Sequence, residues 1–347
     1  MIPDRTGGAP PDLLNQEAPL CALARPITPT ADFYRRSNFA VPHVDAGTWR
    51  LRVGGEVATP LSLARSDLEA LPRASVSVTL ECAGNGRNLM TPIPPGTPWG
   101  LGAVSTAGFA GVRLRDVLER AGPTAAAVEV LFEGADRGIP DEGDREEPFA
   151  RSLPLDVALG GDALLAWEMN GEPLTGEHGF PLRLVVPGWY GMASVKWLVS
   201  IRLLAEPFRG AFQTERYVYR GEAGIPDGTP VSRIRVRSLI ASPADGDRVP
   251  LGPVEVRGTA WSGIAPVERV EVSTDGGATW AEAALGDAPG PYAARTWRLA
   301  WLPPRRGEFR VMARATDGAG NVQPAAPVAN ELGYGNNVIH TVRLTVV

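Results

Sequence analysis

The stretch Val76-Ser77-Val78-Thr79-Leu80-Glu81-Cys82-Ala83-Gly84-Asn85-Gly86-Arg87 says more about the fold than any other part of the chain. Its first five residues alternate between apolar and small polar side chains, as β-strands do. Two glycines follow, and glycine permits a tight turn and a close approach of the backbone. The pattern predicts a strand that presents a lone cysteine at its end, with an arginine a few residues beyond it.

Cys82 permits two interpretations. A cysteine without a nearby partner is commonly a small buried hydrophobe. Beside Arg87, however, its thiol can have a lowered pKa and act as a thiolate, either a nucleophile or a metal ligand. The other cysteine, Cys21, has no assigned role. If Cys82 binds a metal, the chain forms no disulfide, which fits a reducing compartment.

Composition restricts the class of protein. The 347 residues are 44% apolar, enough for one large or two medium domains. The net charge of −5 disfavours a nucleic-acid surface. No apolar run approaches about 18 residues, so no membrane-spanning helix is expected. The N-terminus lacks the apolar core of a signal peptide, which predicts a cytoplasmic protein, or a periplasmic one if a leader has been removed.

Helix and strand patterns divide the chain into three parts. Residues 1–29 are proline-rich and predict an irregular arm. Residues 30–228 mix strand patterns, such as Val128–Phe132, with helix patterns, such as Arg113–Ala121, and predict an α+β domain. Residues 229–347 contain short alternating strands between glycine-rich turns, typical of an all-β sandwich of immunoglobulin type.

Three local patterns make finer predictions. Ser66-Asp67-Leu68-Glu69 has the spacing of a capping box and predicts a short helix that stops before Pro72. The acidic, glycine-rich stretch 134–148 predicts a surface loop. The alternating run 233–237 predicts the first strand of the sandwich.

The pattern Cys-Ala-Gly-Asn-x-Arg at residues 82–87 resembles the sulfite oxidase family of molybdenum enzymes. Further blocks resemble that family in the same order, and they lie at 33–38, 99–104, 132–136, 166–171, 178–183 and 195–197. One such block is weak support, whereas several in register are strong. The resemblance implies a molybdopterin-binding catalytic domain of sulfite oxidase type at 30–228, followed by an immunoglobulin-like dimerisation domain at 229–347.

The resemblance also implies roles for individual residues. Cys82 corresponds to the single protein ligand of molybdenum. One molybdopterin supplies two further sulfur ligands to the metal. The residues that correspond to the catalytic, substrate-side positions are Arg36, Arg87, Trp99 and Tyr219, with Tyr217 as the alternative to Tyr219. The residues that correspond to cofactor contacts are Asn38, Asp136, His178, Arg183, Ser194 and Lys196, the last being the one lysine of the chain.

The implied activity is the oxidation of sulfite to sulfate by oxygen-atom transfer in a homodimer. Arginine suits a doubly charged oxyanion because it offers several planar donors. The sequence has neither a CxxCH haem motif nor a cytochrome b5-like segment, so electrons are expected to leave to an external acceptor, for example cytochrome c.

Other functions stay open from the sequence. Leu332 stands where animal members of the family place a substrate-pocket arginine, which leaves another oxyanion or a sulfoxide as possible substrates. A related molybdenum enzyme that reduces a sulfoxide or nitrate is one alternative. A non-catalytic β-sandwich binding protein is the other, because that architecture hosts many unrelated functions.

Overall fold

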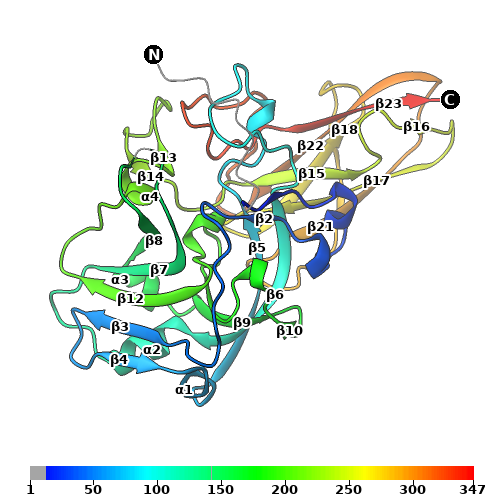
Figure 1. Ribbon diagram of the computed structural model, residues 1–347. Coiled ribbons are helices and arrows are strands. Elements are labelled where there is room, and N and C mark those ends of the chain that lie inside the picture. The colour runs from blue at the N-terminus through cyan, green and yellow to red at the C-terminus, as the bar shows by residue number, and fades with distance from the viewer. Residues whose placement is uncertain (1–12, 142) are drawn as a thin grey trace.

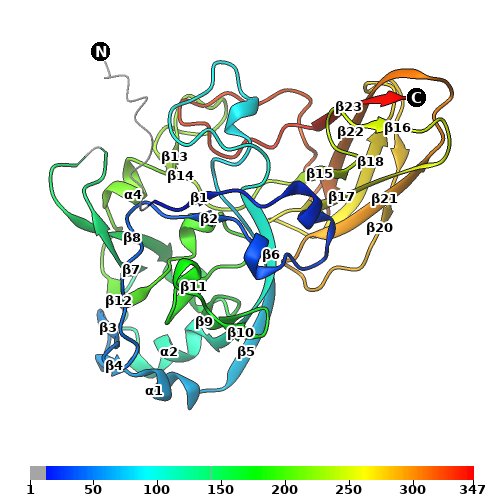
Figure 2. The same ribbon diagram turned by 45° about the vertical axis from the view of Figure 1, so that its right-hand side comes forward.

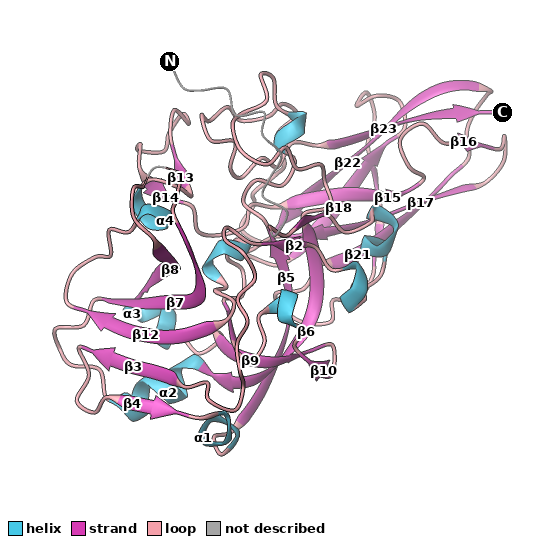
Figure 3. Ribbon diagram, viewed as in Figure 1, coloured by secondary structure: helices cyan, strands magenta, loops and turns pink. Residues whose placement is uncertain are grey.

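The computed structural model describes residues 13–141 and 143–347, so the first twelve residues of the expected arm and Glu142 lie outside the described part. The chain forms a mixed domain with an elongated sandwich beside it (Figure 1). Strands make up most of the regular secondary structure in both parts, and the helices are short (Figure 3). Within the described residues, no helix is long and apolar enough to span a membrane.

Two five-stranded sheets form the first domain. One has the order β10-β9-β6-β5, with β11 paired to β9, and the other has the order β4-β3-β12-β7-β8. The strands of the first sheet are β5 (Arg73–Glu81), β6 (Val104–Arg113), β9 (Leu164–Met169), β10 (Glu172–Pro173) and β11 (Arg183–Val185). Those of the second are β3 (Leu51–Gly55), β4 (Leu61–Leu63), β7 (Glu129–Gly138), β8 (Glu147–Pro154) and β12 (Leu198–Leu204).

Short helices and two small sheets complete this domain. The α-helices are α1 (Arg65–Glu69), α2 (Leu114–Ala121), α3 (Leu155–Leu159) and α4 (Ala211–Thr214). The 3₁₀ turns are η1 (Leu20–Ala24), η2 (Thr30–Asp32), η3 (Arg87–Leu89), η4 (Gly176–His178) and η5 (Gly191–Ala193). The small sheets pair β1 (Asn15–Gln16) with β2 (Arg35–Arg36), and β13 (Val218–Tyr219) with β14 (Thr229–Pro230).

The predicted helix at 113–121 is confirmed by α2. It buries Leu114, Val117, Leu118 and Ala121, whose spacing gives one apolar face. It ends at Gly122, whose φ of 69° is left-handed and therefore suits glycine.

Two finer predictions are wrong in part. The N-cap of helix α1 is Ala64, two residues before the expected Ser66, because the backbone N–H of Ala64 donates to the Asp67 carboxylate at 2.8 Å. The stretch 134–148 is not a continuous loop. It holds the end of β7 and the start of β8, which pair at Gly138 and Glu147, since pairing to a neighbouring strand overrides glycine's low strand propensity.

Two sheets pack against each other in the C-terminal sandwich, around a core of valines, alanines and two tryptophans. One sheet contains β15 (Arg237–Ser242), β17 (Val254–Trp261), β20 (Ala284–Leu285) and β21 (Arg295–Trp301). The other contains β16 (Arg248–Val249), β18 (Val267–Ser273), β19 (Ala281–Glu282), β22 (Gly307–Asp317) and β23 (His340–Val346). The alternating run 233–237 is an extended connection rather than a strand, since β15 begins only at Arg237.

The sandwich is attached to the strand that leads to Cys82 (Figure 2 shows the two domains side by side). The loop between β20 and β21 lies along β5, where the Thr79 N–H donates to the Tyr292 carbonyl at 2.9 Å. The Ala294 N–H donates to the Thr79 hydroxyl at 2.7 Å. The second domain is thereby held in a defined position behind the cysteine.

His340 makes the sandwich sensitive to acid. Its Nδ1 accepts a hydrogen bond from the Ile240 N–H at 3.0 Å, and burial lowers its pKa from 6.5 to about 4. Because the folded pKa lies below the unfolded one, this stability is present above pH 6.5 and is lost as the pH falls toward 4. We expect a loss of about 3 kcal/mol over that interval, measured by denaturation at a series of pH values. His340→Asn, which retains an acceptor but does not titrate, is expected to flatten this dependence; an unchanged slope would assign it to other groups.

Candidate active site

A cavity lies at the end of β5. It contains about 690 Å³ of empty space, solvent at its mouth included, which is the size of a small-molecule or cofactor pocket. Its lining comes from distant parts of the chain: β2, the cysteine loop, the end of β7, and the segments around η4, η5 and Tyr217. The fold therefore gathers in one place residues from five of the seven sequence blocks, whereas the blocks at 99–104 and 166–171 contribute none.

Eight of the eleven predicted site residues line this cavity. They are Arg36, Asn38, Cys82, Asp136, His178, Arg183, Ser194 and Lys196. The other three, Arg87, Trp99 and Tyr219, are buried outside its lining. The lining also includes residues that the sequence analysis did not single out, among them Phe149 and Glu177.

Cys82 is held by its backbone at the end of β5. Its N–H donates to the Ala103 carbonyl at 2.8 Å, and its carbonyl accepts from the Asn85 N–H at 2.9 Å. The loop then turns at Gly86, whose φ of 80° favours glycine. Burial raises the pKa of the Cys82 thiol, and the positive charge of Arg36 opposes this. The charge of a bound metal would favour the thiolate much further.

Cations surround most of the cavity. Arg183 donates to the carbonyls of His178 and Ser194 at 3.1 and 3.4 Å, and burial lowers its pKa to about 10. Lys196 donates to the Glu177 carbonyl at 2.9 Å. Burial and the neighbouring Arg183 lower the pKa of Lys196 to about 7. Neither cation forms an ion pair within the described residues, so the cavity is prepared for an anion.

The hydrogen-bonding capacity of this lining fits a phosphate-bearing pterin. Arg183 Nε and Asp136 Oδ1 are buried without a hydrogen-bond partner among the described residues. The first can donate to a phosphate, and the second can accept from a pterin amine. Burial, followed by Arg183 and Lys196, lowers the pKa of His178 to about 4, so its ring is neutral at pH 7. The thiol supplies one soft metal ligand, and the described residues contain no cluster of three acidic, histidine or cysteine side chains for a conventional metal site.

Arg87 lies outside the cavity lining because its guanidinium is bound elsewhere. It donates to the Leu332 carbonyl at 3.0 and 3.2 Å and to the Thr97 carbonyl at 2.7 Å. These bonds hold it against the C-terminal loop instead of inside the cavity. Trp99, whose backbone carbonyl accepts from the Asn88 N–H at 3.1 Å, is buried outside the lining.

The structure places Tyr217, the alternative to Tyr219, in the lining of the cavity, and Tyr219 outside it. Tyr217 lines the cavity, and its hydroxyl lies 3.2 Å from both side-chain amide atoms of Asn38. Tyr217 has a φ of 53°, an uncommon value for tyrosine, and this turns the chain before Tyr219. The Tyr219 ring packs instead 4.8 Å from the guanidinium carbon of Arg235.

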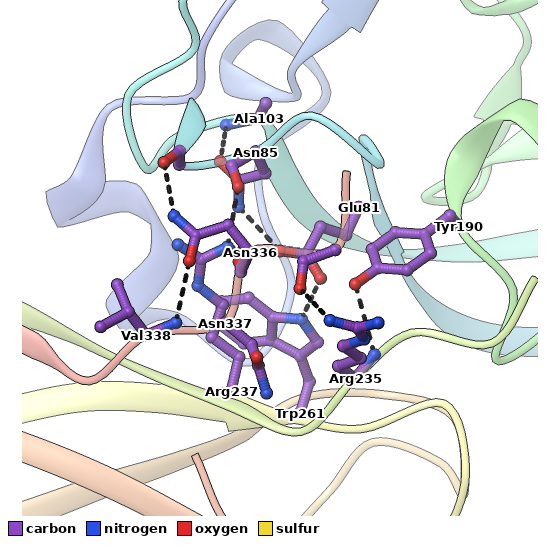
Figure 4. Close-up of polar contacts among 12 residues, drawn as sticks. Glu81, Asn85, Ala103, Tyr190, Arg235, Arg237, Trp261, Asn336, Asn337 and Val338 are labelled. Atoms are coloured by element: carbon purple, nitrogen blue, oxygen red, sulfur yellow. Dashed lines mark hydrogen bonds and ion pairs between the residues drawn. The ribbon is translucent and has the colours of Figure 1, made fainter. Parts of the chain in front are cut away.

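A buried polar network is centred on Glu81, the residue that precedes the cysteine (Figure 4). The Glu81 carboxylate accepts from Arg237 at 2.9 Å, from Trp261 at 2.8 Å and from Asn85 at 2.9 Å. Arg237 also donates to the Asn336 carbonyl at 2.8 Å. Glu81 and Asn85 belong to the cysteine loop, whereas the other partners belong to the sandwich. Both domains therefore determine where the thiol sits.

Comparisons with known proteins match both parts of the chain to described families. The sequence pattern of the family described as "Oxidoreductase molybdopterin binding domain" matches residues 38–212, and that of "Mo-co oxidoreductase dimerisation domain" matches residues 229–347. The chain is 39% identical to mitochondrial sulfite oxidase of Homo sapiens over 97% of its own length and 63% of the relative's. It is 35% identical to sulfite oxidase of Arabidopsis thaliana, over 95% of this chain and 91% of that one.

Among solved structures, the chain is similar to the sulfane dehydrogenase SoxCD from Paracoccus pantotrophus. The TM-score is 0.84 at 29% identity, over 98% of this chain and 86% of the other. The chain spans less than two thirds of the human relative's length.

Proposed function

Because the chain belongs to the sulfite oxidase family of molybdopterin oxidoreductases, we propose that it oxidises sulfite to sulfate and passes the electrons to an external acceptor. The observation that carries this proposal is that Cys82 and Arg36 line one cavity together with the cofactor-type residues Arg183 and Lys196. A thiol for a soft metal and a guanidinium for an anion are the two protein groups that the reaction needs.

The enzyme is a molybdenum-cofactor oxidoreductase, and the proposed cofactor contacts follow from the lining. Cys82 would ligate the metal as a thiolate. Arg183 and Lys196 would bind the phosphate, Asp136 would accept from the pterin, and the neutral His178 ring would donate to a pterin acceptor. When bound, the cofactor supplies the two-electron oxygen-atom transfer, and the protein's part is binding, orientation and electrostatics.

Arg36 and Tyr217 are the proposed substrate-side groups. Arg36 donates to the Asn38 side-chain oxygen at 2.8 Å, and Asn38 in turn contacts the Tyr217 hydroxyl. This chain of contacts fixes a cation and a phenol on one side of the cavity. Their donors would orient a sulfite oxyanion so that its sulfur faces the metal end.

The second domain is the proposed dimer interface. Residues 229–347, which we assign to an immunoglobulin-type sandwich, would join two copies, with residues 30–228 as the catalytic domain of each.

A cytochrome c is a suitable external acceptor because it takes one electron at a time from a donor at the protein surface.

Steady-state sulfite oxidation by protein of known molybdenum content tests the proposal, with cytochrome c and ferricyanide as acceptors. Turnover at low sulfite concentration that scales with molybdenum content is the expected result. Fully loaded protein that leaves sulfite unchanged would contradict it.

A compound that carries a sulfane sulfur is the second candidate substrate, and the same assay tests it. Leu332, which lies outside the cavity lining, adds no positive charge there, and its carbonyl holds Arg87 outside the lining too. A cavity without these two charges favours a substrate of lower charge than sulfite. The structural similarity to a sulfane dehydrogenase supports this candidate. Faster turnover of a persulfide than of sulfite would favour it.

The two tyrosines provide a matched pair of variants. Tyr217→Phe removes the hydroxyl that contacts Asn38 at the cavity, and we expect kcat/KM for sulfite to fall by about tenfold, the effect of one lost hydrogen bond to a charged group. Tyr219→Phe removes a hydroxyl outside the lining and is expected to change kcat/KM by less than about twofold. The reverse order of effects would restore Tyr219 as the cavity tyrosine.

A further inference from the structure

Arg151 is a buried cation that has no role in the site described so far. It lies on β8, is 1% exposed, and donates through Nη1 to the Phe212 carbonyl. Its Nε has no hydrogen-bond partner among the described residues. Within the same residues it forms no ion pair. A charge so placed is costly unless something else offsets it.

The surroundings of Arg151 lead to the cavity. Its guanidinium carbon lies 5.8 Å from the centre of the Tyr217 ring, and Tyr217 lines the cavity. Phe149, which is two residues earlier on the same strand and therefore on the same face, lines it as well. Arg151 thus stands immediately behind one wall of the cavity.

The groups around Arg151 do not neutralise it. The Tyr217 and Tyr334 rings lie 5.3 Å apart, with Arg151 near the first and the Arg87 guanidinium 5.2 Å from the second. Glu129 acts on Arg151 electrostatically without forming an ion pair, and its carboxylate accepts from the Phe208 N–H at 2.9 Å. Burial lowers the pKa of Arg151 to about 10, so it remains charged at pH 7. Two guanidinium groups therefore flank the aromatic pair beside the cavity.

We infer that Arg151 is a specificity-determining residue, whose buried charge favours a doubly charged oxyanion in the cavity over a singly charged or neutral substrate. It acts across Tyr217 and does not touch the substrate. The buried protein around Arg151 has a lower effective dielectric constant than water. The electrostatic attraction between its charge and an anion several ångströms away is therefore weakened less than it would be in water. The cost of burying the charge without a partner is offset when the anion binds. The inference rests on the proposed function, since it assumes that this cavity receives the substrate.

Direct binding of sulfate to the molybdenum-loaded protein tests the inference, because sulfate carries two charges and undergoes no turnover. Arg151→Gln removes the charge and keeps a donor for the Phe212 carbonyl. Arg151→Lys keeps the charge. Arg115→Gln on α2, an exposed arginine, controls for the change in net charge. Binding is followed by the change in tryptophan fluorescence, and the melting temperature is recorded for each variant.

The expected result is that Arg151→Gln weakens sulfate binding about tenfold, whereas the lysine variant and the Arg115 control stay close to wild type. The melting temperature of Arg151→Gln should be unchanged or higher, because an unpaired buried charge is removed. Sulfate affinity unaffected by Arg151→Gln, with a lowered melting temperature, would make Arg151 a structural residue and overturn the inference. Wild-type protein that binds no sulfate would overturn it too.

The same experiment separates this inference from the proposed function. A protein whose sulfate affinity depends on the charge of Arg151, but which does not oxidise sulfite, would refute the proposed substrate and keep the role of the residue. A protein that oxidises sulfite with equal KM in the wild type and Arg151→Gln would keep the function and remove the role.

Discussion

Cys82→Ser is expected to abolish turnover while the fold is retained. The thiol lies in the cavity, and its removal takes away the one cysteine thiolate that the lining offers to molybdenum. We expect activity to fall by more than about 100-fold, the upper range for losing an outer-shell group alone. The backbone bonds of residue 82 do not involve the sulfur, so the melting temperature of cofactor-free protein should stay close to wild type.

Cys21→Ser is the matched control for this experiment. Cys21 is exposed and outside the cavity lining, so its loss should leave both activity and molybdenum content unchanged. Activity of Cys82→Ser near the wild-type level would exclude the thiol as the metal ligand. Equal losses in both variants would point to a general effect of removing cysteines.

Arg237→Met is expected to destabilise the protein more than any surface substitution. It leaves the Glu81 carboxylate, which is 1% exposed, with only the donors of Trp261 and Asn85. Removing one partner of a buried pair costs about 3–5 kcal/mol, because the remaining charge is uncompensated. For a domain of this size we expect the melting temperature to fall by roughly 10 °C. Activity should fall too, because the carboxylate belongs to the residue next to Cys82.

Two further variants show whether loss of the Arg237–Glu81 ion pair accounts for the lower stability of Arg237→Met. Glu81→Gln combined with Arg237→Met should lose less than the sum of the single variants, because no charge remains buried. Arg343→Met breaks an exposed pair with Asp245, 2.8 Å apart, and should cost less than about 1 kcal/mol. Strict additivity of the first two changes would contradict the assigned ion pair.

The sequence was informative wherever neighbouring residues decide the structure. The cysteine loop needs only a strand and two glycines, and α2 needs only one apolar face and a terminal glycine. The blocks that resemble the family brought eight site residues to one cavity. Each of these features depends on a local pattern or on a matched motif.

The sequence did not predict side-chain positions that depend on contacts between distant parts of the chain. The carbonyl of Leu332 draws Arg87 away from the cavity across 245 positions, and Arg237 pairs with Glu81 across 156. The choice between Tyr217 and Tyr219 depends on one backbone angle that spacing does not reveal. Of these long-range contacts, the sequence gives a sign only of the pair that involves Glu81. A carboxylate at the end of a buried strand requires a buried partner.

The cysteine loop is completed by the last part of the chain. Asn336 donates to the Gly86 carbonyl at 2.7 Å, and the Gly335 N–H donates to the Ala83 carbonyl at 2.8 Å. These residues follow the cysteine loop by about 250 positions, so during synthesis they emerge from the ribosome well after it. Until they dock, the loop lacks two of its hydrogen bonds. If Cys82 ligates the metal, as proposed, a cofactor that arrives before the second domain has folded would meet a loop whose geometry is not yet fixed.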